Sequence, residues 1–167
     1  GLAWDAFLNG GQPLLGNPNR FVLYPSRILY LFMDPTSGLN WEISIHFVLG
    51  GLGTVLLARR LDLSRAGSAV AGLSYALSGL SISISSHLGR LMAYHWMPWI
   101  LLAVHAGLCK KTRNSWAWQL AIPLFFSAQW LTGTAESVAL TAVAAVGWAA
   151  TVHFPGGGWH RAVIRSC

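Results

Sequence analysis

The stretch Ala58-Arg59-Arg60-Leu61-Asp62-Leu63-Ser64-Arg65 is a short charged turn between two long apolar segments. Residues 39–57 precede it, with Glu42 and His46 as their ionisable groups, and residues 66–86 follow it without any Asp, Glu, Lys or Arg. Each segment has about the 20 residues that a helix needs to cross a bilayer. Because Lys and Arg are retained on the cytoplasmic side, the three arginines of this turn predict a membrane hairpin that turns in the cytoplasm.

The composition of the whole chain indicates an integral membrane protein. Of its 167 residues, 54% are hydrophobic and 10% are charged, whereas a soluble domain carries about 25% charged residues. A formal net charge of +6 would favour nucleic-acid binding in a soluble protein. Here the basic residues lie in short turns, and no basic face has interleaved aromatic side chains. We therefore expect no nucleic-acid partner.

Further apolar segments extend the hairpin to an all-α integral membrane protein with about five transmembrane helices. The expected spans are residues 39–58, 66–86, 91–108, 116–131 and 135–152. The second and third spans are joined by an outer connection at residues 87–99, with Pro98 in the first turn of the next helix. Eight basic residues fall on the predicted inner side and three, Arg20, Arg27 and Arg90, on the outer side, which agrees with the positive-inside rule.

Three regions follow from this topology. Residues 1–38 are expected to form an outer-face loop with a short interfacial helix near residues 24–33, residues 39–152 the transmembrane bundle, and residues 153–167 a cytoplasmic tail. Cys109 and Cys167 fall on the reducing cytoplasmic side and match no CxxC or metal pattern, so we expect free thiols and no metal site. A start at Gly1 without a signal peptide suggests a fragment.

Polar side chains accumulate on the predicted outer side, which indicates an outward-facing site, because an ionisable residue near a span is costly and points to function. The candidates are Asp5, Gln12, Asn17, Asn19, Arg20, Glu42, His46, His87, Arg90 and Glu136. Other interpretations remain open. Glu42 and His46 would also form a hydrogen-bonded pair one helical turn apart, Arg90 would also contact a lipid headgroup, and Glu136 would also stabilise a helix N-terminus.

The order of several motifs resembles the bacterial YfhO-like membrane proteins. The resemblance covers roughly residues 2–148 and is carried by residues 4–19 (WDAFLNGGQPLLGNPN), Tyr24-Pro25, the span from Asn40 to Arg60, Leu61-Asp62-Leu63-Ser64, Ala76-Leu77-Ser78-Gly79, His87-Leu88, Trp96-Met97-Pro98-Trp99 and Gly133-Thr134-Ala135-Glu136. That family is similar to the GT-C glycosyltransferases, which use polyprenyl-phosphate sugars at the outer membrane face. The resemblance implies a GT-C-like partial bundle in the bacterial cytoplasmic (inner) membrane, which transfers a sugar from that donor to a cell-envelope acceptor.

The resemblance also implies roles for the outer residues. A carboxylate in the first outer loop serves GT-C enzymes as general base, and its family position is expected upstream of Gly1, so a fragment would be inactive alone. Asp5 stands where relatives more often have Asn. Arg90, and second Arg20, would stabilise the lipid phosphate. The sugar hydroxyls would form hydrogen bonds with Gln12, Asn17 and Asn19, while the pocket would be lined by His87 and Glu136. The lipid-linked sugar is the donor substrate, and no cofactor is assigned.

Two other classes of function compete with the enzyme. The first is a non-catalytic transmembrane subunit packed against other membrane subunits and lipids, in which His46, His87 or His95 would ligate a tetrapyrrole metal. The second is a transporter, which predicts an inverted repeat with broken helices near the midplane. The sequence contains no such repeat, and its charges lie near the outer end of the predicted spans rather than in the middle.

Overall fold

The computed structural model describes residues 4–5, 10–13, 21–109 and 114–153, and these form a helical bundle. The helices are η2 (Pro25–Leu31), α1 (Pro35–Arg60), α2 (Arg65–Ala76), α3 (Gly79–Ser83), η3 (Ile84–Ser86), α4 (Leu88–Leu108), α5 (Ser115–Trp130) and α6 (Ala135–His153). Two strands of two residues each, β1 (Trp4–Asp5) and β2 (Gln12–Pro13), pair antiparallel ahead of the helices.

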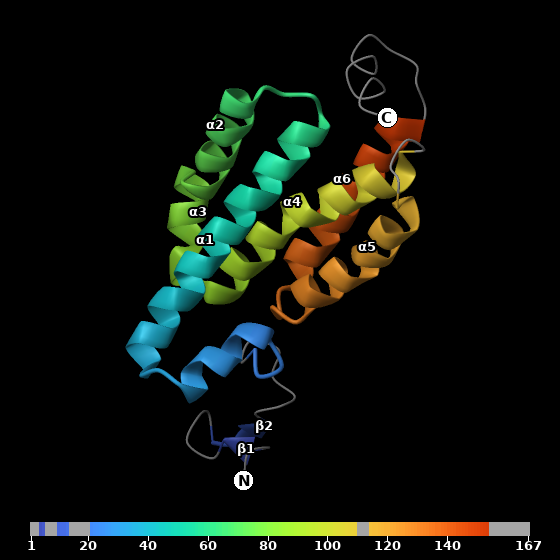
Figure 1. The fold of residues 1–167 in the computed structure, drawn as a ribbon. Helices are drawn as coiled ribbons and strands as arrows, with labels where there is room; N and C mark the ends of the chain where they lie inside the picture. The colour runs from blue at the N-terminus through green and yellow to red at the C-terminus, as the bar shows by residue number, and fades with distance from the viewer. Residues whose placement is uncertain (1–3, 6–9, 14–20, 110–113, 154–167) are drawn as a thin grey trace.

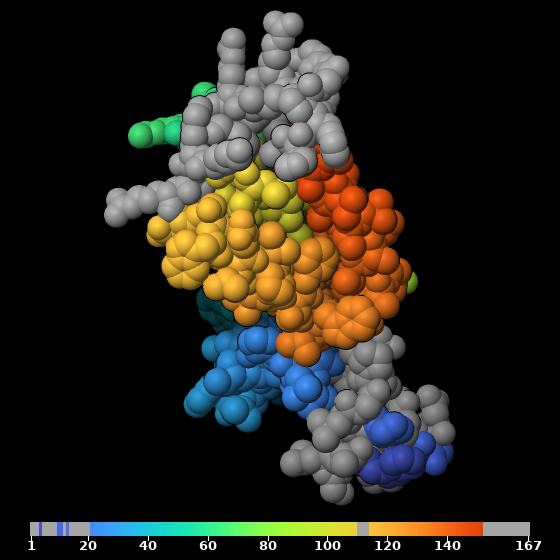
Figure 2. Space-filling model, turned by 90° about the vertical axis from the view of Figure 1, so that its right-hand side faces the viewer, coloured from blue at the N-terminus to red at the C-terminus, as the bar shows by residue number. Residues whose placement is uncertain are grey.

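Helix α4 is the centre of the bundle. It packs against α1, α5 and α6, and α2 packs against the outer side of α1 (Figure 1). Thirteen residues of α4 are buried, and Ile100 and Val104 form a core cluster with Ala145 of α6. Figure 2 shows α5 and α6 side by side, with η2 and the start of α1 beneath them.

Within the described part of the chain, three helical segments are long and apolar enough to cross a membrane: Pro35–Arg60, Arg65–Ser86 and Leu88–Leu108. Ala135–Thr151 is a shorter apolar helix. Many large apolar side chains on these helices point outward, among them Val48, Leu52, Val70, Leu73, Leu140 and Val143. Long apolar helices with apolar outer faces are features of a membrane protein.

The two ends of the bundle are occupied by different connections (Figure 1). The η2 end carries η2, the start of α1, the link from η3 to α4 and the turn from α5 to α6. The Arg59 end carries the turn from α1 to α2 and the last turn of α4. Helix α1 begins after Asp34, whose carboxylate accepts a hydrogen bond from the Ser37 backbone N–H at 2.9 Å. That bond lowers the pKa of Asp34 and stabilises the helix N-terminus.

The segment expected as one helix over residues 66–86 is interrupted at Leu77 and Ser78. The hydroxyl of Ser78 accepts a hydrogen bond from the Ser81 backbone N–H at 3.1 Å and so begins α3 as a new helix. Serine competes with the helix for backbone groups in this way. The interruption was not predicted from the hydrophobic pattern.

The expectation of an outer connection at residues 87–99 is wrong, because α4 begins at Leu88 and Pro98 lies in its interior. A proline has no N–H, so the carbonyl four residues before it, that of Tyr94, loses its helical partner. The hydroxyl of Tyr75 on α2 donates to this carbonyl at 2.6 Å. This hydrogen bond therefore links α2 to α4, and it pairs a carbonyl oxygen that would otherwise lack a donor.

The expectation of a free thiol at Cys109 is also wrong, because Cys109 is disulfide-bonded. That expectation rested on the predicted compartment of the loop and not on distances between sulfur atoms. Cys167 lies outside the described residues. Trp96 and Trp99 are partly buried, and both contact the Phe125 ring, Trp96 in a stacked arrangement and Trp99 edge-on.

Candidate functional site

The first polar cluster at the η2 end surrounds Glu42, whose side chain is completely buried. Its carboxylate accepts hydrogen bonds from the hydroxyl of Ser26 and, at 2.8 Å, from the hydroxyl of Tyr30. Arg27 Nη1 lies 3.8 Å from Glu42 Oε2 and completes an ion pair. All three partners belong to η2, so this carboxylate attaches η2 to α1. Burial and the bond to the carboxylate raise the pKa of Tyr30.

His46 lies one turn further along α1 and joins the same cluster through its ring. Its Nδ1–H donates to the backbone carbonyl of Glu42 at 2.7 Å, because a carbonyl can only accept. The other ring nitrogen, Nε2, is then the acceptor for the hydroxyl of Tyr24 at 2.7 Å. Trp96 Nε1–H donates to the Tyr24 oxygen at 2.8 Å. Burial raises the pKa of Tyr24 to about 12, so this phenol keeps its proton at neutral pH.

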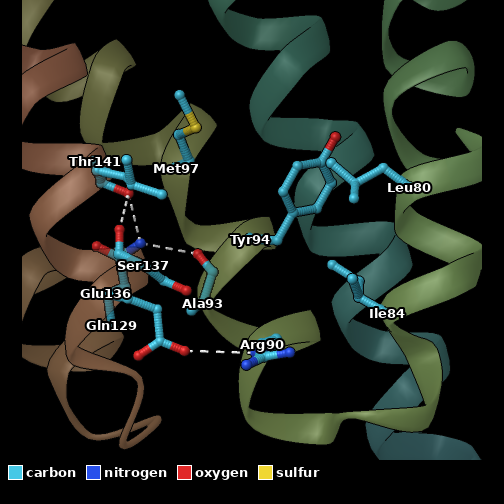
Figure 3. A pocket seen from close by; sticks show the side chains of 11 residues that line it. Leu80, Ile84, Arg90, Ala93, Tyr94, Met97, Gln129, Glu136, Ser137 and Thr141 are labelled. Atoms are coloured by element: carbon cyan, nitrogen blue, oxygen red, sulfur yellow. Dashed lines mark hydrogen bonds and ion pairs between the residues drawn. The ribbon is translucent and has the colours of Figure 1, made fainter.

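A second polar cluster lies between α4 and α6 and is open. Arg90 in the first turn of α4 faces Glu136 in the first turn of α6, with Nε and Oε1 3.4 Å apart (Figure 3). Their side chains are 56% and 60% exposed. An exposed pair of this kind is worth about 0.2–1 kcal/mol. Either residue can therefore exchange its partner for a ligand at little cost.

Two glycines bring α4 close to the turn between α5 and α6. A Cβ on Gly89 would lie 2.8 Å from the Phe21 ring and from the Thr132 carbonyl oxygen. Gly133 has φ +70°, the left-handed conformation that glycine adopts without strain. The close approach at Gly89 is what places Arg90 beside Glu136.

Arg90 and Glu136 are shared by two cavities, which together we call the groove. The first, of about 280 Å³, runs between α3–η3, α4 and α6 and has mostly apolar walls, which include Leu80, Ile84, Met97 and Leu140. In Figure 3 the side chains of Tyr94 and Leu80 point toward one another. The second cavity, of about 330 Å³, is more polar and is lined by Phe21, His87, Leu88, Gly89, Gly133 and Thr134.

Gln129 of α5 is a buried polar residue in the wall of the apolar cavity. Its Nε2 donates to the Ala93 carbonyl at 3.0 Å and to the Thr141 hydroxyl at 2.8 Å (Figure 3). Its Oε1 is buried without a hydrogen-bond partner within the described part of the chain. A buried acceptor left unpaired costs about 1–3 kcal/mol, and a water or ligand hydroxyl can satisfy it.

The structure brings together three of the residues proposed from sequence, His87, Arg90 and Glu136, in the wall of the groove. Glu42 and His46 do not line it, because their polar groups are used in binding η2. Asp5 lies in β1 and Gln12 in β2. Three further candidates, Asn17, Asn19 and Arg20, lie outside the described residues.

Sequence reasoning missed Gln129, Thr134 and the apolar residues of α3 and η3 as parts of this site. Gln129 lies in a helix of mostly apolar side chains. An amide side chain in such a helix indicates a contact with a neighbouring helix. Leu80 and Ile84 carry no such signal, because apolar side chains in a membrane segment face lipid or protein equally well.

His46 and His95, two of the three histidines of the pigment alternative, have both ring nitrogens in hydrogen bonds. In His95 the Nδ1–H donates to the Leu91 carbonyl at 2.8 Å, and Nε2 accepts from the Ser81 hydroxyl at 3.1 Å. Both ring nitrogens of His46 are engaged as well. A metal ligand needs a free ring nitrogen, so neither buried histidine favours a tetrapyrrole. Within the described ranges no three His, Cys, Asp or Glu side chains form a group that would hold a metal ion.

The chain matches no protein-family model, no curated protein and no solved structure.

Proposed function

We propose that this chain is part of a membrane glycosyltransferase of the kind its motifs resemble, and that the groove holds the polyprenyl-phosphate sugar donor. The observation that carries the proposal is the pair of adjoining cavities, one apolar and one polar, with Arg90 where they meet. A ligand that fits both has a long apolar part, an anionic junction and a polar head. A lipid-linked sugar phosphate has these three parts in this order.

Each part of the donor has a counterpart in the groove. The isoprenoid chain lies between η3, α4 and α6, against Ile84, Met97 and Leu140. The phosphate takes the place of the Glu136 carboxylate beside the Arg90 guanidinium, because guanidinium binds phosphate with paired N–H donors. The sugar occupies the polar cavity, where His87 and Thr134 offer hydrogen-bonding groups.

The chemistry needs two kinds of group. A general base removes the proton of the acceptor hydroxyl, which attacks the anomeric carbon while the lipid phosphate leaves. Arg90 stabilises the negative charge on the leaving phosphate. Glu136 holds Arg90 in place while the groove is empty, and we do not assign it as the base.

The topology that we propose places the η2 end at the outer face of the bacterial cytoplasmic membrane, with five spans formed by α1, α2–η3, α4, α5 and α6. The support is the cluster of Arg59, Arg60 and Arg65 at the opposite end, since arginines are retained on the cytoplasmic side. The donor then lies where such lipid-linked sugars are used.

The proposal is tested by ligand binding to the purified chain in lipid nanodiscs. The probes are a polyprenyl-phosphate glucose and the corresponding neutral polyprenol. We expect the phosphate sugar to bind at least tenfold more tightly than the polyprenol, and the Arg90→Ala variant to lose that difference. Equal binding of both probes would contradict a phosphate site. Unchanged turnover of labelled donor in membranes containing the Arg90→Ala protein would remove Arg90 from the reaction.

A further inference from the structure

Phe21 lies in the wall of the polar cavity, just ahead of η2 in the chain. Its ring reaches the first turn of α4, where a Cβ on Gly89 would lie 2.8 Å from two ring atoms. A side chain at position 89 would therefore displace the ring. Because glycine stands there, the ring lies against the backbone of α4 next to Arg90, and both residues line the same cavity.

The backbone of Phe21 has an unusual conformation. Its φ is +51°, in the left-handed region that a bulky side chain rarely adopts, because its Cβ crowds the following carbonyl. A turn holds this conformation, since the N–H of Tyr24 donates to the Phe21 carbonyl at 3.0 Å and the Tyr24 side chain is buried. Strain of this kind persists where the surroundings determine it, and it is concentrated at residues that contact ligands.

Arg27 of η2 fixes the orientation of the Phe21 ring. Its guanidinium carbon lies 5.4 Å from the centroid of that ring and 5.0 Å from the centroid of the Tyr30 ring, in cation–π contacts. Arg27 is itself held by the ion pair with the buried Glu42 carboxylate, with Nη1 and Oε2 3.8 Å apart. The ring is thus held between a cation over one face and the α4 backbone at Gly89, so binding a ligand would cost it little conformational entropy.

Packing alone does not account for an aromatic ring at this position. Contact with Gly89 needs only an apolar side chain of similar size. Much of the remaining cavity wall offers hydrogen-bonding groups, those of His87, Thr134 and Glu136. A flat ring among such groups matches a pyranose sugar, whose C–H groups form an apolar face and whose hydroxyls point away from the ring edge. Burial of that face against an aromatic ring removes apolar surface from water.

We propose that the sugar ring of the lipid-linked donor stacks on Phe21, on the face opposite Arg27. The inference rests on the proposed function, because it concerns the same groove and the same donor, and it names Phe21 as the residue that selects a pyranose over an open-chain polyol. Gly89 places Phe21 next to the turn of α4 that carries Arg90, so a sugar attached to a phosphate at Arg90 lies beside this ring. Arg27 acts through Phe21 as a positioning residue.

The test is a titration of the whole chain in lipid nanodiscs with polyprenyl-phosphate glucose and polyprenyl-phosphate glycerol. Both probes are phosphodiesters of the same charge that carry hydroxyl groups, but the glycerol probe has no pyranose face. We expect the wild type to bind the glucose probe about fivefold more tightly, the effect of one aromatic contact. Phe21→Leu should lose this preference and keep its affinity for the glycerol probe. Phe21→Tyr keeps the ring and should retain the preference.

Phe47→Leu is the matched control, because Phe47 lines the cavity between α1 and α2 and not the groove. This variant should keep the preference for the glucose probe. If Phe21→Leu does not fold, fluorine NMR of Phe21→4-fluorophenylalanine takes its place. The fluorine resonance should shift on addition of the glucose probe and stay unchanged with the glycerol probe.

The outcomes separate this inference from the proposed function. Equal binding of the two probes by the wild type, a preference that persists in Phe21→Leu, or an equal loss of affinity for both probes in that variant would assign Phe21 to packing alone. A fluorine resonance that the glucose probe does not shift would do the same. In each of these cases the donor site at Arg90 would stand, whereas binding of neither probe by the wild type would overturn both proposals.

Discussion

Glu42 and Glu136 lie at the same end of the bundle, each close to an arginine, yet their surroundings differ. The Glu42 carboxylate is completely buried and accepts from two hydroxyl groups besides its ion pair with Arg27. The Glu136 carboxylate is 60% exposed and contacts Arg90 beside two cavities. A buried carboxylate with all its partners present holds the fold together, whereas an exposed pair that lines two cavities is accessible to a ligand.

This comparison shows why an ionisable residue in a membrane helix does not by itself mark a site. The cost of burying Glu42 is met by hydrogen bonds from η2, so its function is complete within the chain. The Arg90 and Glu136 side chains, in contrast, are held together by one exposed ion pair.

The largest effect is expected for Glu42→Ala. Removing the carboxylate leaves Ser26, Tyr30 and Arg27 without their acceptor, and η2 loses its attachment to α1. The free energy of unfolding should fall by about 2–3 kcal/mol, measured by titration with a denaturing detergent. Glu42→Gln keeps the shape and one carbonyl acceptor, so its loss should be smaller. If Glu42→Gln keeps its fold but no longer binds polyprenyl-phosphate glucose, Glu42 belongs to the binding site and its role is not only structural.

The next effect concerns Tyr24 at alkaline pH. Its folded pKa is about 12 against an ordinary value of 10, so the folded state holds the proton more tightly than the unfolded state. This contribution is complete below about pH 10 and is lost as the pH rises toward 12, with a maximum of about 2–3 kcal/mol. Unfolding measured from pH 9 to 12 should therefore show a steeper loss in the wild type than in Tyr24→Phe. If stability falls with pH equally in the wild type and in Tyr24→Phe, burial does not raise the pKa of Tyr24.

Arg90→Gln should separate binding from stability. The ion pair with Glu136 is exposed, so the free energy of unfolding should change by less than about 1 kcal/mol. Loss of a charge-assisted bond to phosphate should weaken binding of polyprenyl-phosphate glucose about tenfold or more. Arg65→Gln at the other end is the control for loss of one positive charge. A stability loss as large as that of Glu42→Ala would mean that Arg90 is structural.

Glu136→Gln should have the smallest effect, and in the opposite direction. The neutral amide no longer competes with the lipid phosphate for Arg90, so the affinity for polyprenyl-phosphate glucose should rise about two- to fivefold. The measurement is the same nanodisc titration, at two salt concentrations, since the gain from removing an exposed carboxylate shrinks as salt screens it. A tenfold loss of affinity would instead assign Glu136 a direct contact with the donor.

The sequence was sufficient for α5, α6 and the turn between α1 and α2, because each of these helices is a long apolar segment between turn residues. The expected spans at residues 116–131 and 135–152 correspond closely to α5 and α6, and the turn at Arg59–Arg65 separates α1 from α2 as expected. The short helix expected near residues 24–33 is present as η2, a 3-10 helix, and its place in the membrane interface stays a prediction. Whether these helices cross the membrane as five spans stays a prediction.

The contacts between helices were not accessible from the same pattern. Hydropathy does not distinguish a face that packs on protein from one that faces lipid, so the central position of α4 was not predicted. The Tyr75 hydrogen bond that compensates for Pro98 inside α4 joins residues 19 positions apart, so the hydrophobic pattern does not indicate it. In the candidate site, the sequence identified the charged residues but not the apolar residues of the wall.

The most direct measurement of the central claim is photo-crosslinking with a polyprenyl phosphate that carries a diazirine in its first isoprene unit. Peptide mapping after irradiation in nanodiscs identifies the labelled side chains. Our account predicts adducts on Met97, Leu140 and Ile84 in the wall of the groove, and loss of these adducts in Arg90→Gln. Equal labelling of Leu52 and Leu73, which lie in the outward-facing cavity between α1 and α2, would contradict a specific lipid-phosphate site.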